Sequence, residues 1–360
     1  MAELNTIVTP PADQAAAVIG SIDIDQLPDL AATLTDYKGF RDLLKRYKKV
    51  DDGATNSWTW HPLTAYHHST KGVDPWEPLT SGQTPGVKDC SVTPVLIVTT
   101  FAYNVRDLKV IRNSTGDKKV LKRRIYDHLA KLKAQAYGGK TEWFESQIWE
   151  GPTDESDTKH LLGFYGYWLT SGTSKGFTGN DPSGFSSGAG GLLKANASRW
   201  CNYWDSYTSG VIDIKVVDAL REAADETNWQ PVIEPTISEG ANKGSPEPII
   251  YTTKTNRRAL ANLARQQNAQ AGLDLGWDRK RFHVSGMTIE PVAWLEKNKA
   301  TKAPFIGIDW RWWQFREDGG MRISGETMPY DQPLVRNYYE YLEMNIICKK
   351  RDANFLIEAE

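Results

Sequence analysis

The sequence lacks several features that would assign a chain of this length to a common class. Among 360 residues there are three cysteines, at positions 90, 201 and 348, with no C-x-x-C pair. Widely spaced cysteines in odd number argue against a disulfide framework and predict buried, inert thiols in a reducing compartment. No apolar run approaches the roughly 18 residues of a membrane span, and the opening MAELNT has no secretory signal pattern. We therefore expect a cytoplasmic chain without a membrane span.

Strong charge and cofactor motifs are also missing. The formal net charge is -2, so a nucleic-acid or membrane role would have to be regional. There is no Walker loop, and 188–193 lacks the last glycine of a dinucleotide fingerprint. His61, His67 and His68 cluster in a proline-broken stretch, which supports metal ligands poorly. We expect no cofactor and no metal.

Aromatic residues, by contrast, are abundant. The chain has 14 Trp and 15 Tyr, although its mean hydropathy is only -0.52. Such side chains are enriched at protein interfaces and in sugar-binding clefts, and composition does not choose between the two.

The first part of the chain predicts extended segments. Residues 1–50 read as an arm with a short amphipathic helix from about Asp36 to Lys49. Residues 51–105 are broken by glycine and proline, with strand-like pieces at Trp58–Tyr66 and Val95–Tyr103. Together these pieces predict a long hairpin, which is marginally stable alone and needs another surface to rest on.

A long basic helix is predicted next, from the N-cap Asp117 to about Ala136, where Gly138 and Gly139 end it. One face is apolar and the remainder carries lysine and arginine. That cationic face fits either a solvated surface, the usual interpretation, or contact with phosphates. The segment Glu142–Gly151 is expected to form a strand.

The rest of the chain predicts a long surface loop and a mixed lobe. Residues 163–191 are rich in Gly, Ser and Thr and predict the loop. A helix is expected over Asp213–Thr227 with Val216, Val217, Leu220 and Ala224 inward, and another from near Asn256. Strands are expected at residues 248–253, 282–284, 287–289, 305–308, 335–347 and 355–357.

Two patterns suggest enzymes. Gly184–Gly188 matches G-x-S-x-G, but no apolar strand precedes it, which favours a flexible loop over a nucleophile elbow. The run FIGIDWRWWQF at 305–315, with Asp309, Glu317 and Asp318, is compatible with a glycosidase cleft. The simpler interpretation is a packed strand whose arginines pair these acids. We therefore expect no catalytic residues.

The order of the elements resembles the tailed-phage major capsid family, whose fold is named for the Hong Kong ninety-seven phage and is shared with encapsulins. The resemblance runs from about Asp36 to the C terminus and rests on element order, since the family has no invariant catalytic signature. The segments that carry the resemblance are ESQIWEG (145–151), GGLL (190–193), VVDALREAADETNW (216–229), PIIYTTKTNRRALANLARQQ (248–267) and NIICKKRDANFLI (345–357).

This resemblance implies an α+β capsid fold. Residues 1–50 would form the N-terminal arm, and 51–105 the extended hairpin, or E-loop. Residues 106–210 would form the first part of a peripheral domain, with the spine helix at 117–136 and the Gly/Ser-rich loop. Residues 211–320 would form an axial α/β domain, and 321–360 the second part of the peripheral domain.

The resemblance also implies a function in the virion. The chain would assemble into pentamers and hexamers of an icosahedral head that encloses double-stranded DNA, with a portal and a decoration protein. Since only some 35 residues precede the first helix, we expect either a separate scaffolding protein or none, and no large cleaved domain. Alternatives are an encapsulin-like compartment and a Trp-rich carbohydrate-active enzyme. Two sites are expected. The first is a genome-facing basic face formed by Lys119, Lys122, Arg123 and Lys133, and the second is a set of inter-subunit aromatic anchors formed by Trp58, Trp60, Tyr66 and Trp76.

Overall fold

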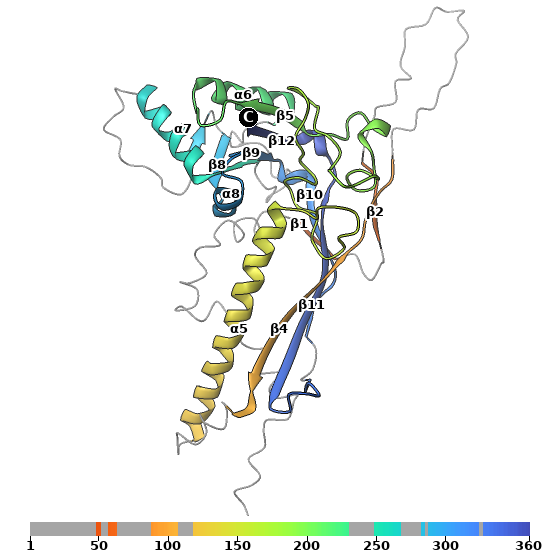
Figure 1. Cartoon of the computed structure of the whole chain (residues 1–360), viewed down its shortest axis with the longest axis vertical. Helices are drawn as coiled ribbons and strands as arrows, with labels where there is room; N and C mark the ends of the chain where they lie inside the picture. Colours follow the sequence, from red (N-terminus) through yellow and green to blue (C-terminus); the bar gives the residue numbers. More distant parts are fainter. Residues whose placement is uncertain are drawn as a thin grey trace, which may run out of the picture. The chain divides into compact units, whose positions relative to one another are not determined.

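The computed structural model describes residues 48–51, 57–62, 88–106, 118–229, 248–267, 282–284, 287–323 and 327–360 (Figure 1). These residues form two compact units. Unit 1 takes its described residues from Leu96–Glu145 and Gly319–Glu343. Unit 2 takes its described residues from Arg41–Val95, Ser146–Asp318 and Met344–Glu360. Among these residues, no helix is long and apolar enough to cross a bilayer.

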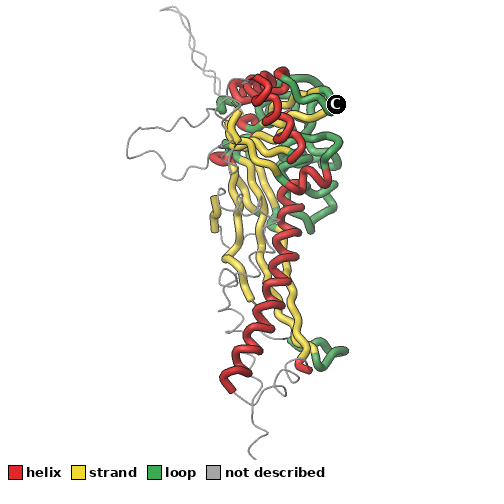
Figure 2. Tube along the Cα trace, turned by 90° about the vertical axis from the view of Figure 1, so that its left-hand side faces the viewer, coloured by secondary structure: helices red, strands yellow, loops and turns green. Residues whose placement is uncertain are grey.

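The core of unit 1 lies between a helix and a sheet (Figure 2). In the sheet order β1-β10-β11-β4, residues 96–104 of β4, 319–323 of β10 and 335–343 of β11 belong to unit 1. Strand β1 and the residues of β10 with which it pairs in parallel, 314–317, belong to unit 2. On β4, Phe101 and Tyr103 point inward and pack with Leu129 and Ala130 of α5 and with Tyr338 of β11. The elements are β1 (Lys48–Asp51), β4 (Val95–Asn104), β10 (Trp313–Ile323), β11 (Val335–Cys348) and α5 (Lys118–Trp149).

Helix α5 is longer than the sequence predicted. It continues through the two glycines at 138 and 139 and through the predicted strand Glu142–Gly151, for 32 residues in total. Two helical glycines cost about 1 kcal/mol each relative to alanine. Burial of Phe144, Ile148 and Trp149 outweighs that cost, since all three side chains leave water only if the helix continues. The predicted helix end and the predicted strand were therefore wrong.

The core of unit 2 is built on a six-stranded mixed sheet with the order β5-β12-β9-β6-β8-β7. The C-terminal strand β12 lies inside this sheet, parallel to β5 and antiparallel to β9. Strand β6 is antiparallel to β9 and parallel to β8. The strands are β5 (Tyr203–Tyr207), β6 (Ile249–Thr252), β7 (Phe282–Val284), β8 (Met287–Pro291), β9 (Phe305–Ile308) and β12 (Phe355–Ala359).

Helices α6 (Ile214–Glu226) and α7 (Lys254–Gln267) pack on one face of this sheet, and α8 (Ala293–Asn298) follows β8. The carboxylate of Asp213 accepts the backbone N–H groups of Lys215 and Val216 and so caps α6. Val216, Leu220 and Ala224 are buried and Val217 packs partly buried against the same core, as their helical spacing predicts. The helix predicted for 213–227 is confirmed.

The base of the predicted hairpin is a two-stranded sheet. Strand β2 (Trp58–Trp60) pairs antiparallel with β3 (Cys90–Val92). The partner is therefore β3, whereas the predicted partner, Val95–Tyr103, belongs to β4 in the four-stranded sheet. The tip of the hairpin lies outside the described residues, as does the predicted helix Asp36–Lys49 except for Lys48 and Lys49, which belong to β1.

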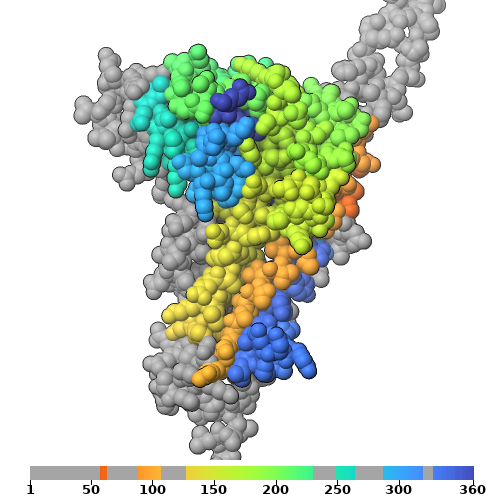
Figure 3. All heavy atoms as spheres, viewed as in Figure 1, coloured from red at the N-terminus to blue at the C-terminus, as the bar shows by residue number. Residues whose placement is uncertain are grey.

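The Gly/Ser-rich segment 163–191 is not a surface loop. It has no long helix or strand, but Phe164, Trp168 and Leu169 are fully buried, and Figure 3 shows the yellow-green segment as a compact part of the surface. Its apolar cluster GFYGYWL, at 163–169, is largely buried in spite of the glycines around it. Residues 146–210 and 344–360 share a unit with 211–318. The division into peripheral and axial domains stays a prediction.

Candidate functional site

Most tryptophans of the described residues belong to the cores. In unit 2, the Trp168 ring lies 6.2 Å from Trp60, 6.4 Å from Trp200 and 6.2 Å from Trp313. Phe164 packs edge-on against Trp313 at 4.5 Å. The buried tryptophans are Trp58, Trp60, Trp149, Trp168, Trp200, Trp204, Trp229, Trp310 and Trp313. The aromatic composition thus reflects the interior of unit 2.

This burial corrects two of the four predicted inter-subunit anchors. Trp58 is 1% exposed and Trp60 is 5% exposed within the single chain, so neither needs a partner to leave water. The prediction assumed that a hairpin has no core of its own, but the base of this hairpin packs on unit 2. The other two anchors, Tyr66 and Trp76, lie outside the described residues.

A buried arginine that the sequence did not single out holds the irregular segments of unit 2 together. Arg351 is fully buried, and its guanidinium donates to the carbonyl oxygens of Trp168 at 2.8 Å, Trp200 at 2.9 Å and Asn180 at 3.2 Å. One side chain thereby satisfies backbone carbonyls in three turns. The only sequence signal is a cation between two apolar strands, in CKKRDANF.

The last strand also carries a buried carboxylate. Glu358 is 1% exposed and accepts hydrogen bonds from the hydroxyls of Tyr165 and Ser171, both at 2.5 Å, and from the Trp204 indole at 3.2 Å. Burial, together with the negative charge of Glu358, raises the pKa of Tyr165 well above its usual range. These contacts stabilise the fold, because both carboxylate oxygens of Glu358 accept hydrogen bonds from other residues of the chain.

The predicted basic face of α5 is only partly described. Lys119, Lys122 and Arg123 lie in the helix, and their side chains fall outside the described residues. Lys133 does not belong to an exposed face: it is 4% exposed, with its ammonium 5.6 Å from the centre of the Tyr137 ring. The prediction placed Lys133 on the exposed face because lysine is charged. The long aliphatic part of a lysine side chain, however, packs well in a core.

The inner face of α5 contains a buried polar group. The Tyr137 hydroxyl donates to Glu340 of β11 at 2.9 Å, and the Lys140 ammonium lies 3.7 Å from the same carboxylate. Burial lowers the pKa of Lys140, while Glu340 acts in the opposite direction. An ion pair at this depth fixes the register of helix against strand more than it adds stability.

The G-x-S-x-G pattern does not form a nucleophile elbow. Ser186 sits in an irregular segment, and its hydroxyl lies 3.0 Å from a carboxylate oxygen of Glu155. The Ser187 backbone N–H donates to the same carboxylate at 2.8 Å. These bonds hold the pKa of Glu155 below its usual range. Among the described contacts no histidine reaches Ser186. The hydrogen bonds to Glu155 instead join two irregular segments of the chain.

The aromatic run at 305–315 packs in the core, and its one carboxylate binds an arginine. It contributes β9, a short helical turn at Trp310–Trp312 and the start of β10. Asp309 is 2% exposed and binds Arg311, whose Nε lies 2.9 Å from a carboxylate oxygen. Trp310 and Trp313 are buried in the core. The interpretation of a packed strand with paired charges fits this geometry.

Metal and thiol chemistry have no support in the described part of the chain. No group of three or more His, Cys, Asp or Glu side chains there could hold a metal ion. His61 pairs with Asp89 at 2.7 Å, and His160 pairs with Asp157 at 2.6 Å. All three cysteines are free and buried, and burial raises the pKa of Cys90 to about 12.

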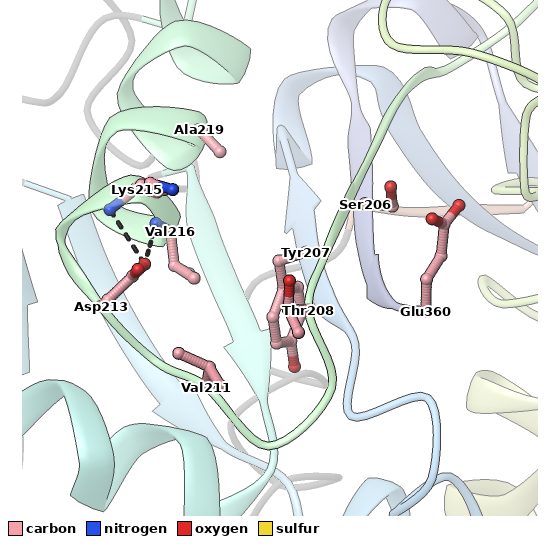
Figure 4. Close-up of a pocket in the computed structure, with 9 residues that line it drawn as sticks. All are labelled: Ser206, Tyr207, Thr208, Val211, Asp213, Lys215, Val216, Ala219 and Glu360. Atoms are coloured by element: carbon pink, nitrogen blue, oxygen red, sulfur yellow. Dashed lines mark hydrogen bonds between the residues drawn. The ribbon is translucent and has the colours of Figure 1, made fainter.

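One hollow of about 320 Å³ opens beside the first turn of α6 (Figure 4). Val211, Val216 and Ala219 form an apolar wall, and the carboxylates of Asp213 and Glu360 lie at its rim. The Asp213 carboxylate is already used to cap α6. The hollow is small and its lining holds no group set up for a reaction, so it suits a side chain from another molecule better than a reacting substrate.

Comparisons with known proteins show where this fold occurs. No protein-family model and no curated protein matches the sequence. The cyanophage A-1(L) capsid subunit matches over 88% of this chain and 92% of its own, at a TM-score of 0.58 and 11% identity. The capsid subunit of a native GTA particle matches over 89% and 90%, at a TM-score of 0.52 and 13% identity. The chain therefore has the α+β fold of phage capsid subunits, as the order of its sequence elements predicted.

Proposed function

We propose that this chain is the major capsid protein of a tailed double-stranded DNA bacteriophage, which assembles from pentamers and hexamers into an icosahedral head around the genome. The observation that carries the proposal is the match of nearly the whole chain to nearly the whole of a cyanophage capsid subunit. The hydrogen-bonded polar groups described above, Arg351, Glu358 and Asp309, serve the fold and not a reaction.

The proposal is tested by purifying the chain after expression and imaging it by electron microscopy. We expect closed icosahedral particles, with nuclease-protected double-stranded DNA when they are isolated from infected cells. Particles that hold an enzyme and no nucleic acid would instead indicate an encapsulin-like compartment. A monomer that turns over a carbohydrate would overturn the shell proposal.

The proposed partners of the shell are a portal, a separate scaffolding protein, a decoration protein and the packaged DNA. Contact with DNA is assigned to Lys119, Lys122 and Arg123 of α5, because cations that meet phosphates release counterions without reading sequence. Lys133 is left out of this group, since its side chain is buried.

The DNA contact is tested by reversing the three charges together, as Lys119→Glu, Lys122→Glu and Arg123→Glu. We expect a shorter packaged genome or less stable filled heads. Lys131→Glu is the matched control, because Lys131 is an exposed residue of the same helix outside the proposed group. Unchanged genome length and head stability in the triple variant would refute the contact.

A further inference from the structure

The two helices on one face of the unit 2 sheet expose opposite charges. At helical spacing, α6 exposes Asp218, Glu222, Asp225 and Glu226, which we call the acidic stripe. Helix α7 contains no acidic residue and exposes Lys254 and Arg258, which we call the basic stripe. Figure 3 shows green α6 and teal α7 uncovered at the surface.

Part of this charge is not neutralised by other described residues. Asp218 lies 3.6 Å from Arg221, and Glu222 binds Lys175. Asp225 and Glu226 make no ion pair with another described residue, and neither do the side chains of Lys254 and Arg258. Among the described residues, the acidic end of α6 and the basic start of α7 therefore have no ion-pair partner of opposite charge.

Both stripes run against the helix dipole. Asp225 and Glu226 occupy the last turn of α6, where anions are unfavourable, and this turn has no basic residue. Lys254 occupies the first turn of α7, where cations are unfavourable; this turn has no acidic residue of its own, and the carboxylate that binds it is that of Glu296 in α8, which accepts the Thr255 backbone N–H at 3.1 Å. Charges placed against local stability at two exposed sites indicate a role outside the fold of the single chain.

The stripes also lie toward opposite ends of the same layer. Helix α6 contacts β5 and β12, while α7 contacts β8, and these strands lie toward opposite edges of the sheet order β5-β12-β9-β6-β8-β7. A body with complementary surfaces at two ends associates head to tail. Such heterologous contacts close into rings when the rotation between copies allows it.

We propose that the acidic stripe of α6 binds the basic stripe of α7 in a second copy of this chain, and that this contact repeats around each ring of the shell. The inference rests on the proposed shell function and names the surfaces that join neighbours. Ile214, 52% exposed, and Val211, 48% exposed, border the acidic stripe and add apolar contact area. The hollow beside Val211 is lined by Asp213 and Glu360 as well as by Lys215 (Figure 4).

The test is a charge swap measured by particle yield in sedimentation and electron microscopy. One variant carries Asp225→Lys with Glu226→Lys, the second carries Lys254→Glu with Arg258→Glu, and the third carries all four changes. Each single-stripe variant should lower the yield of particles at least about tenfold, since like charges then face each other. The four-fold variant should restore it. Lys159→Glu and Asp331→Lys are controls on exposed residues away from both stripes.

The design separates assembly from folding. The substitutions at 225, 226 and 254 improve the match to the helix dipoles, so a loss of particles does not follow from weaker helices. Single-stripe variants that assemble like the wild type, or a four-fold variant that fails to recover, would overturn the inference while the shell function stands. Shells that form but lack DNA after reversal of Lys254 and Arg258 would make the basic stripe a nucleic-acid surface and also overturn it. A wild-type chain that stays monomeric would remove the shell function and this contact together.

Discussion

At the scale of single residues, buried polar side chains organise the parts of unit 2 that have no regular secondary structure. Arg351 is the centre of this arrangement, because its guanidinium joins the carbonyl groups of Trp168, Trp200 and Asn180. Its charge has no carboxylate within ion-pair distance among the described residues, so the carbonyl dipoles and the Trp200 ring, 6.0 Å away, stabilise it.

Replacement of this arginine should be strongly destabilising. In Arg351→Met three buried carbonyl oxygens lose their donors, and we expect the free energy of unfolding to fall by about 3 kcal/mol or more. Urea unfolding of the subunit measures the change. The control Arg221→Met removes an exposed arginine and should stay within about 0.5 kcal/mol of the wild type. A loss below about 1 kcal/mol in Arg351→Met would contradict the assigned role.

Asp205 should make stability depend on pH. Burial raises its pKa above the ordinary value of 3.8, with Glu222 and Glu360 adding to the effect and Lys175 opposing it. The folded state then holds the proton more tightly than the unfolded state. This contribution to stability is fully present below 3.8 and is lost as the pH rises through the folded pKa.

The Asp205→Asn variant does not titrate there, so it should gain stability relative to the wild type as the pH rises from below 3.8. Unfolding curves of both proteins over a pH series measure the difference. A difference that stays constant, or that changes in the opposite direction, would show that burial does not govern this carboxyl.

At the scale of elements, local patterns predicted most of the unit 2 framework. The strand Phe305–Ile308 and the helix capped by Asp213 were found where the sequence placed them, because a buried apolar run and a capped amphipathic pattern are local signals. Helix α5 was missed beyond Ala136, because Trp143, Phe144 and Ile148 favour strands when read locally. Only tertiary burial makes them helical.

The two kinds of glycine should respond differently to alanine. A Cβ added at Gly139 of α5 meets no atom within 4 Å, so Gly139→Ala should stabilise the protein by about 0.5 to 1 kcal/mol. A Cβ at Gly163 would lie 2.6 Å from the backbone of Glu150 and Gly151, so Gly163→Ala should destabilise it. Thermal unfolding of both variants compares them, and the same sign for both would contradict the packing described here.

At the scale of the whole molecule, the order of elements was a better guide than any single motif. It predicted the capsid fold, although no short motif is diagnostic and identity to the matched capsid subunits is 11% to 13%. The division into units was not predictable in the same way. Residues 344–360 join the sheet of unit 2 through β12, a pairing between distant segments that local sequence does not encode.

The burial of Trp58 and Trp60 changes the physical reason for assembly. These two tryptophans are already buried in the single chain, so under the proposed shell function contacts between copies rely on surface charge and on exposed apolar residues elsewhere. Assembly driven this way weakens as salt screens the charges. The candidates for such contacts are the acidic stripe of α6, the basic stripe of α7 and the exposed residues Val211 and Ile214.

Sedimentation velocity of the purified full-length chain tests the central claim most directly. We predict particles built from many copies, which sediment far faster than a 40.5 kDa subunit and dissociate into smaller rings or subunits on disruption. A single species at the subunit mass, unchanged at high concentration and at low salt, would contradict the account of this chain as a shell protein.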